Sequence, residues 1–123
     1  MFKRNKREKA RQIGSFDQLQ DLAEYGKPIL VDFYQFGCAP CKVMDGIVDE
    51  IADEVPEVTV VKVNVGTAPW AISEFNIRST PTFMVLAPPT EQAAAKGILR
   101  SRWRASGLVK KDALKEVLAQ HAG

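Results

Sequence analysis

The stretch from residue 29 to residue 65 constrains the fold most, because it places an amphipathic helix between two apolar runs. The first run, Ile29–Tyr34, is rich in strand formers, which is typical of a central strand covered on both faces. The second run, residues 58–65, is also rich in strand formers and predicts a second buried strand. A strand, a helix and a strand in this order predict a right-handed crossover between two parallel strands. The chain is therefore expected to be an α/β protein.

The intervening helix is expected over residues 40–55, and Pro56 ends it. Its apolar residues recur at three- and four-residue steps, so they are expected to form one buried stripe. The stripe consists of Val43, Met44, Ile47, Val48, Ile51 and Val55. The acidic residues are expected to face away from it; they are Asp45, Asp49, Glu50, Asp53 and Glu54.

Caps, helix breakers and periodicity predict the remaining elements. Ser15 followed by Gln18 is a capping-box pattern for a first helix. Leu99, Ser101 and Trp103 alternate with arginines, which predicts an antiparallel edge strand with two distinct faces. In chain order the expected elements are a helix at 15–25, a helix at 69–75, a strand at 82–86, an extended connection at 87–96 with a helical turn at 91–95, a strand at 97–105 and a helix after Gly107.

The length and the charge distribution of the chain limit its domain organisation. A chain of 123 residues is expected to form one domain, here residues 14–123. Residues 1–11 hold six of the 17 basic residues and one of the 15 acidic residues, so 1–13 is expected to be a basic segment, either disordered or a short first strand. No apolar stretch follows it and no run approaches ~18 apolar residues, so neither a secretory signal nor a transmembrane segment is expected.

The two cysteines of the chain, Cys38 and Cys41, lie at the expected start of the central helix. At such a position the first sulfur faces unpaired N–H groups and the positive end of the helix dipole, which favours the thiolate. A zinc site would need two further ligands, and His121 is the one histidine, so neither a metal nor another cofactor is expected. A structural disulfide closing so short a loop would stabilise little. This cysteine usage favours redox exchange in a reducing, cytoplasmic setting.

Exchange chemistry needs an exposed attacking thiolate and a shielded partner that resolves the mixed disulfide. Cys38 is expected to attack and Cys41 to resolve, with Pro40 stiffening the turn between them. Asp32 lies in an apolar strand, where desolvation would raise its pKa and let it exchange a proton with Cys41 through water. Lys62 could temper that shift. The alternative is an edge Asp32 bonded to backbone, with Lys62 reaching to water.

Several motifs at consistent spacing resemble the thioredoxin family over about residues 15–118. They are Val31-Asp32-Phe33, Cys38-Ala39-Pro40-Cys41-Lys42, Asp49-Glu50-Ile51-Ala52, Lys62-Val63-Asn64-Val65, Ile77-Arg78-Ser79-Thr80-Pro81-Thr82 and Gly107. The resemblance implies a thioredoxin fold, with a central mixed β-sheet flanked by helices, and dithiol–disulfide oxidoreductase activity. It makes Asp32 and Lys62 the buried acid and its lysine partner. It also implies a cis peptide before Pro81, where the local sequence alone favours trans.

The expected substrate groove is the part that departs from the family. It comprises Gly37, Ala39, Pro40, Thr80 and Gly107. Gly37 and Ala39 stand where thioredoxins usually carry Trp and Gly, and Thr80 replaces the usual Ile. The connection between Pro81 and Gly107 is longer than in thioredoxins. The first strand has only a short candidate near residues 10–13.

Three functions remain open at this point. The first is a thioredoxin-like reductase for redox homeostasis, acting on client proteins with disulfides and restored by an upstream reductase such as a thioredoxin reductase. The second is a thioredoxin-fold adaptor with a redox-sensing disulfide. The third is nucleic-acid contact through Arg100, Arg102 and Arg104, but these arginines are more simply a solvated strand face, and no nucleic-acid partner is expected.

Overall fold

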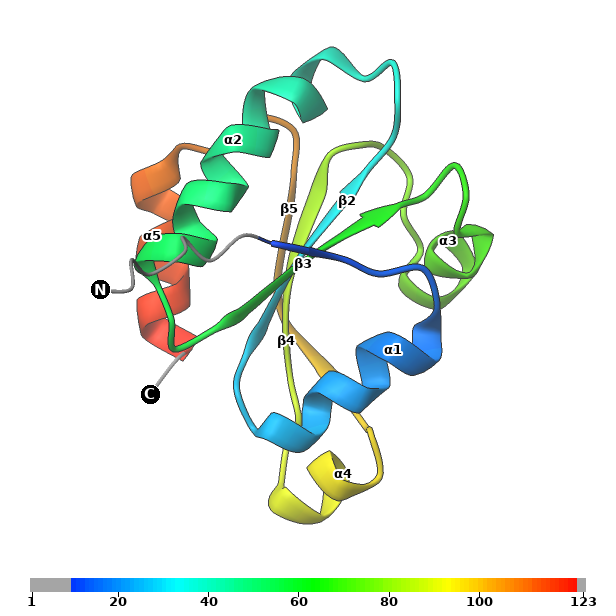
Figure 1. Ribbon diagram of the computed structural model, residues 1–123, viewed down its shortest axis with the longest axis vertical. Coiled ribbons are helices and arrows are strands. Elements are labelled where there is room, and N and C mark those ends of the chain that lie inside the picture. Colours follow the sequence, from blue (N-terminus) through cyan, green and yellow to red (C-terminus); the bar gives the residue numbers. More distant parts are fainter. Residues whose placement is uncertain (1–9, 122–123) are drawn as a thin grey trace, which may run out of the picture.

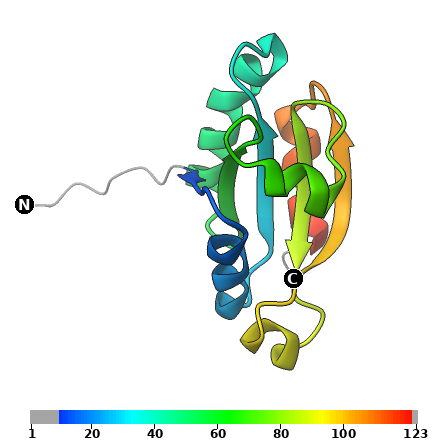
Figure 2. The ribbon, with the colours of Figure 1, turned by 90° about the vertical axis from the view of Figure 1, so that its right-hand side faces the viewer.

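A five-stranded mixed sheet forms the centre of the molecule in this computed structural model, which describes residues 10–121. The strands lie in the order β1-β3-β2-β4-β5, seen from left to right in Figure 2. Strands β1, β3 and β2 are parallel, while β4 and β5 are antiparallel to their neighbours. The elements are β1 (Arg11–Gln12), α1 (Phe16–Asp21), the 3-10 helix η1 (Leu22–Tyr25), β2 (Ile29–Tyr34), α2 (Ala39–Glu54), β3 (Thr59–Asn64), α3 (Pro69–Phe75), β4 (Thr82–Ala87), α4 (Glu91–Ala95), β5 (Arg100–Ser106) and α5 (Lys111–His121).

Helices cover both faces of the sheet. Helices α2 and α5 lie on one face, and α1 and α3 on the other (Figure 1). Successive residues of β2 point to opposite faces, so Leu30 packs into the α2/α5 core while Val31 and Phe33 pack into the α1/α3 core. Burial on both faces explains why this strand reads as an almost unbroken apolar run. Asp32 is the exception, and it lies on the α2 side together with Leu30.

Local signals start and stop the helices as expected. The Ser15 side chain accepts a hydrogen bond from the Gln18 N–H, and the Gln18 side chain accepts one from the Ser15 N–H, which confirms the capping box. Gly26, with φ of 72°, ends η1 in the left-handed region that glycine tolerates best. At α2 the cap is Cys38, and Pro40 lies in the first turn.

Two expectations about side-chain faces are wrong. Val43 belongs to the expected buried stripe of α2, but its side chain is 59% exposed. In β5, Trp103 pairs with Val85 whereas Ser101 pairs with Leu86, so Arg102 is the extra residue of a β-bulge. The bulge interrupts the strict alternation expected over 97–105. Of the basic N-terminal segment, residues 1–9 lie outside the described residues, and Arg11 and Gln12 form the short β1.

Helix α5 is held against α2 by ion pairs and by apolar packing. Lys111 bonds to Glu50 and Glu54, and Lys115 bonds to Glu54. Beneath these exposed pairs, Leu118 belongs to the α2/α5 core. Exposed ion pairs contribute little to stability, so the apolar contact is expected to dominate.

Replacing Leu118 by alanine should therefore lower the free energy of unfolding by about 2–5 kcal/mol, because Leu118 is fully buried. Leu108→Ala is the matched control, since Leu108 is 65% exposed, and it should change stability by less than about 0.5 kcal/mol. Urea unfolding followed by circular dichroism measures both. Equal effects of the two substitutions would contradict this account of the core.

Candidate functional site

The site is built on a disulfide between Cys38 and Cys41 at the first turn of α2. Cys38 is the N-cap residue, and its Sγ accepts a hydrogen bond from the Cys41 N–H at 3.3 Å. Cys38 is half-buried, whereas Cys41 is only 5% exposed. The Cys41 N–H group, which bonds to this sulfur, and the helix dipole both stabilise negative charge on the outer sulfur when the disulfide is reduced. The geometry thus supplies one accessible sulfur and one shielded sulfur.

The loop before β4 brings Thr80 and Pro81 against the disulfide. The Thr80–Pro81 peptide is cis, as the resemblance implies and the local sequence does not. Sγ of Cys38 lies 3.4 Å from the Thr80 carbonyl oxygen. The Pro81 carbonyl accepts a hydrogen bond from the Gly107 N–H at 2.9 Å, and Gly107 has a φ of +87°. The loop before β4 therefore contacts Cys38 through Thr80, and it is joined to the segment after β5 through Pro81.

The residues beside the disulfide differ in exposure. Gly37 and Ala39 are exposed, while Pro40 and Thr80 are half-buried. Gly37 has a φ of +80°, and a β-carbon at this position would meet nothing within 4 Å. The surface next to Cys38 is consequently open. Sequence analysis missed Phe36, a residue that is 80% exposed and whose ring lies edge-on to the Tyr34 ring, with 6.2 Å between the ring centroids.

Asp32 lies on β2, on the side of the sheet that α2 covers, and it is almost completely buried. Its Oδ1 has no hydrogen-bond partner among the described residues. Burial raises the pKa of Asp32 to about 7; the charge of Lys62 lowers it, while those of Asp45 and Asp49 raise it. A carboxyl group with a pKa near neutrality can exchange protons efficiently under physiological conditions.

Lys62 makes its ion pairs with α2. It lies in register with Asp32 on the neighbouring strand. Its Nζ lies 2.7 Å from Oδ1 of Asp45 and 3.0 Å from Oδ1 of Asp49. Burial lowers the pKa of Lys62, but the hydrogen bonds to the two carboxylates outweigh it, so the pKa is raised. Asp45 is exposed and Asp49 is partly exposed, as expected for the face away from the buried stripe. Their pairing with Lys62 was not foreseen, although the four-residue steps from Cys41 to Asp45 to Asp49 place all three on neighbouring turns of one side of the helix.

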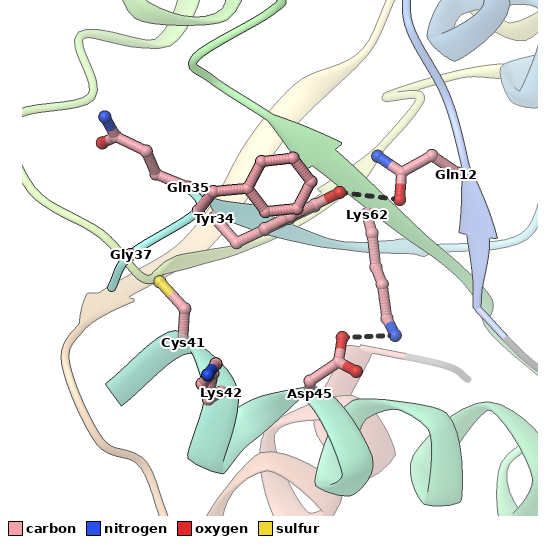
Figure 3. Close-up of a pocket in the computed structure, with 9 residues that line it drawn as sticks. Gln12, Tyr34, Gln35, Gly37, Cys41, Lys42, Asp45 and Lys62 are labelled. Carbon is pink, nitrogen blue, oxygen red and sulfur yellow. Dashed lines mark hydrogen bonds and ion pairs between the residues drawn. The ribbon is translucent and has the colours of Figure 1, made fainter. Parts of the chain in front are cut away.

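A pocket of about 440 Å³ opens beside Cys41. Figure 3 shows the Asp45–Lys62 pair on one side of it and the Cys41 sulfur at one end. On the opposite side, the Tyr34 hydroxyl donates a hydrogen bond to Oε1 of Gln12 at 2.9 Å. The ion pair and Cys41 therefore line the same pocket.

Neither a metal cluster nor a membrane-spanning helix is found in the described part of the chain. Within residues 10–121 there is no group of three or more His, Cys, Asp or Glu side chains placed to hold a metal ion. Among the helices of the same residues, none is long and apolar enough to cross a membrane.

The buried Asp32 should make the stability of the oxidised protein depend on pH. Because its pKa is about 7 in the folded chain and 3.8 for the same group fully exposed to water, the folded state retains the proton between these values. Stability should fall as pH rises from about 4 to about 7, by up to about 4 kcal/mol. Asp32→Asn cannot titrate and should abolish this slope in urea unfolding. A variant with the wild-type slope would refute the assignment.

Comparison with known proteins agrees with this geometry. The thioredoxin family model matches residues 11–118. The thioredoxin of Chlamydia muridarum is 30% identical over 110 residues, which cover 89% of this chain and 97% of that protein. Thioredoxin 1 of Synechococcus elongatus is 43% identical over 67 residues, which cover 54% of this chain. That match spans 63% of the length of the relative, just under two thirds.

Solved structures share the fold. A mutant thioredoxin from Halobacterium salinarum superposes with a TM-score of 0.79 at 23% identity, covering 94% of this chain and 92% of that one. The thioredoxin of Malassezia sympodialis gives 0.78 at 24% identity, covering 99% and 98%. With a family model that spans nearly all of the described residues and a relative aligned over almost its full length, this chain belongs to the thioredoxin family.

Proposed function

We propose that this chain is a thioredoxin-like protein-disulfide reductase that uses the Cys38/Cys41 dithiol. The observation that supports this most directly is the disulfide at the N-terminus of α2, with an accessible outer sulfur that accepts the Cys41 N–H and a shielded inner sulfur. A stabilised outer thiolate is a good nucleophile, and the inner thiol is placed to displace whatever the outer sulfur binds.

The reaction follows from this asymmetry. In the reduced chain the Cys38 thiolate attacks a client disulfide, forms a mixed disulfide and releases one client thiolate. Cys41 then gives its proton to the Asp32 carboxylate through water, and its thiolate attacks the Cys38 sulfur. The second client thiolate leaves and is protonated by solvent. Two electrons have passed to the client, and the Cys38–Cys41 disulfide has formed.

The groove for the client is proposed to lie along Gly37, Ala39, Pro40, Thr80 and Gly107. The Thr80 carbonyl oxygen lies 3.4 Å from the Cys38 sulfur. An extended client segment could use backbone groups of this loop, because open backbone edges recognise extended peptides independently of their sequence.

The partners follow from electron balance. Each turnover leaves the chain oxidised, so an upstream dithiol donor, such as a thioredoxin reductase, must return two electrons. Clients are proteins with accessible disulfides. A reducing compartment such as the cytoplasm is the proposed setting, because both cysteines of the chain are used in exchange and no further cysteines form a structural scaffold.

An adaptor function is the second candidate, and the exposed Phe36 ring beside the site favours it. Large exposed aromatic rings often anchor protein partners. In that case the cysteines would modulate partner binding and would not catalyse repeated disulfide reduction.

Reduction of insulin with dithiothreitol as the electron donor separates the two. The wild-type chain should reduce insulin catalytically, and Cys38→Ser should fall to the uncatalysed rate. Pre-reduced Cys41→Ser, mixed with insulin after dithiothreitol has been removed, should accumulate a mixed disulfide visible by mass spectrometry. Ser101→Ala, at an exposed position on β5 away from the disulfide, is the control and should retain full activity. A wild-type chain with no turnover, whose Cys38→Ser variant still binds partners fully, would favour the adaptor.

A further inference from the structure

Lys62 lies between acidic groups of two different elements. On β2 its neighbour in register is Asp32, which is buried and has an Oδ1 without a partner among the described residues. On α2 the acidic groups are Asp45 and Asp49, and the Lys62 ammonium group bonds to both. A buried carboxyl oxygen without a hydrogen-bond partner is costly. The Lys62 ammonium group is thus bound on α2, while Oδ1 of Asp32 has no partner among the described residues.

Asp45 makes the stronger of the two contacts on α2. Its Oδ1 lies 2.7 Å from Nζ of Lys62. Oδ1 of Asp49 lies 3.0 Å away and also accepts a hydrogen bond from the Ala10 N–H at 3.2 Å, so it is divided between two donors. The Asp45 contact is thus the shorter one, and it lines the pocket beside Cys41 (Figure 3).

We propose that Asp45 is a positioning residue, whose carboxylate holds the Lys62 ammonium group on α2 and so limits the neutralising effect of that group on Asp32. Without Asp45, Lys62 would be bound by Asp49 alone on α2 and could shift toward Asp32. Asp45 also repels negative charge on Asp32 directly. Both effects favour the protonated form of Asp32, so they act in the same direction.

The surroundings of Asp32 support this assignment. Among the described residues, the charged groups that act on it are Lys62 on β3 and Asp45 and Asp49 on α2. On the other neighbouring strand, β4, it is in register with the apolar Phe83. Lys62 is the one cation in this set, so its position decides how far the burial of Asp32 is compensated.

The consequence for catalysis rests on the proposed function. If Asp32 accepts the proton of Cys41, a nearby ammonium group would make the carboxylate a weaker base for that thiol. By holding Lys62 on α2, Asp45 keeps the proton affinity of Asp32 closer to that of the thiol it serves. Asp45 itself need not touch the client or either sulfur.

The direct test is a ¹³C NMR titration of the Asp32 carboxyl carbon in the oxidised chain, where the cysteines do not titrate. Asp45→Asn should lower the midpoint by about one pH unit, and Lys62→Met should raise it. Glu50→Gln removes the same charge from α2 at a residue that pairs with Lys111, and it should leave the midpoint unchanged. An unchanged midpoint in Asp45→Asn would overturn the proposal.

A double-mutant cycle separates positioning of Lys62 from direct repulsion. In the Lys62→Met background there is no ammonium group to move, so Asp45→Asn should lower the midpoint less than it does in the wild-type background. Equal decreases in the two backgrounds would show that Asp45 acts by its own charge alone, and would overturn the positioning role.

The same variants separate this inference from the proposed function. The pH dependence of client release from the mixed disulfide, followed by rapid quench, should move with the Asp32 midpoint. A shifted midpoint with an unchanged pH dependence would refute Asp32 as the base in the reductase mechanism, while supporting the effect of Asp45 on Lys62.

Discussion

The position of the first turn of α2 is the constraint on which the rest of the site depends. Cys38 caps this helix, so its sulfur lies where backbone N–H groups lack helical partners. The same turn buries Cys41 and keeps the two α-carbons 5.2 Å apart. One helix start thereby makes one sulfur accessible and the other shielded, which is the asymmetry that disulfide exchange requires.

The sheet holds this turn in place and supplies what the cysteines lack. Strand β2 leads directly into the site, and the loop before β4 brings the Thr80 carbonyl to Cys38. Asp32 is buried on the side of the sheet that α2 covers, where desolvation raises its pKa to about 7. In the reduced chain the site therefore combines a sulfur whose anionic form is stabilised with a carboxyl group whose anionic form is destabilised. These opposite electrostatic environments lie on one side of the same sheet.

Charge on α2 links the surface of the molecule to this buried carboxyl group. Asp45 is largely exposed, yet it binds Lys62, whose side chain is mostly buried and lies in register with Asp32. An exposed acidic residue can thus affect a buried one through a shared lysine. Asp45 and Lys62 also line the pocket beside Cys41.

Sequence alone determined the strand–helix–strand unit, the capping box at Ser15 and the placement of the cysteine pair at a helix start, because periodicity and caps are local properties. It also singled out Asp32 as a carboxyl group in an apolar strand. Tertiary structure decided the rest. The partners of Lys62, the exposure of Val43 and Phe36, and the bulge at Arg102 depend on which segments pack together. Long-range contacts of this kind follow from how elements pack, and no local pattern records them.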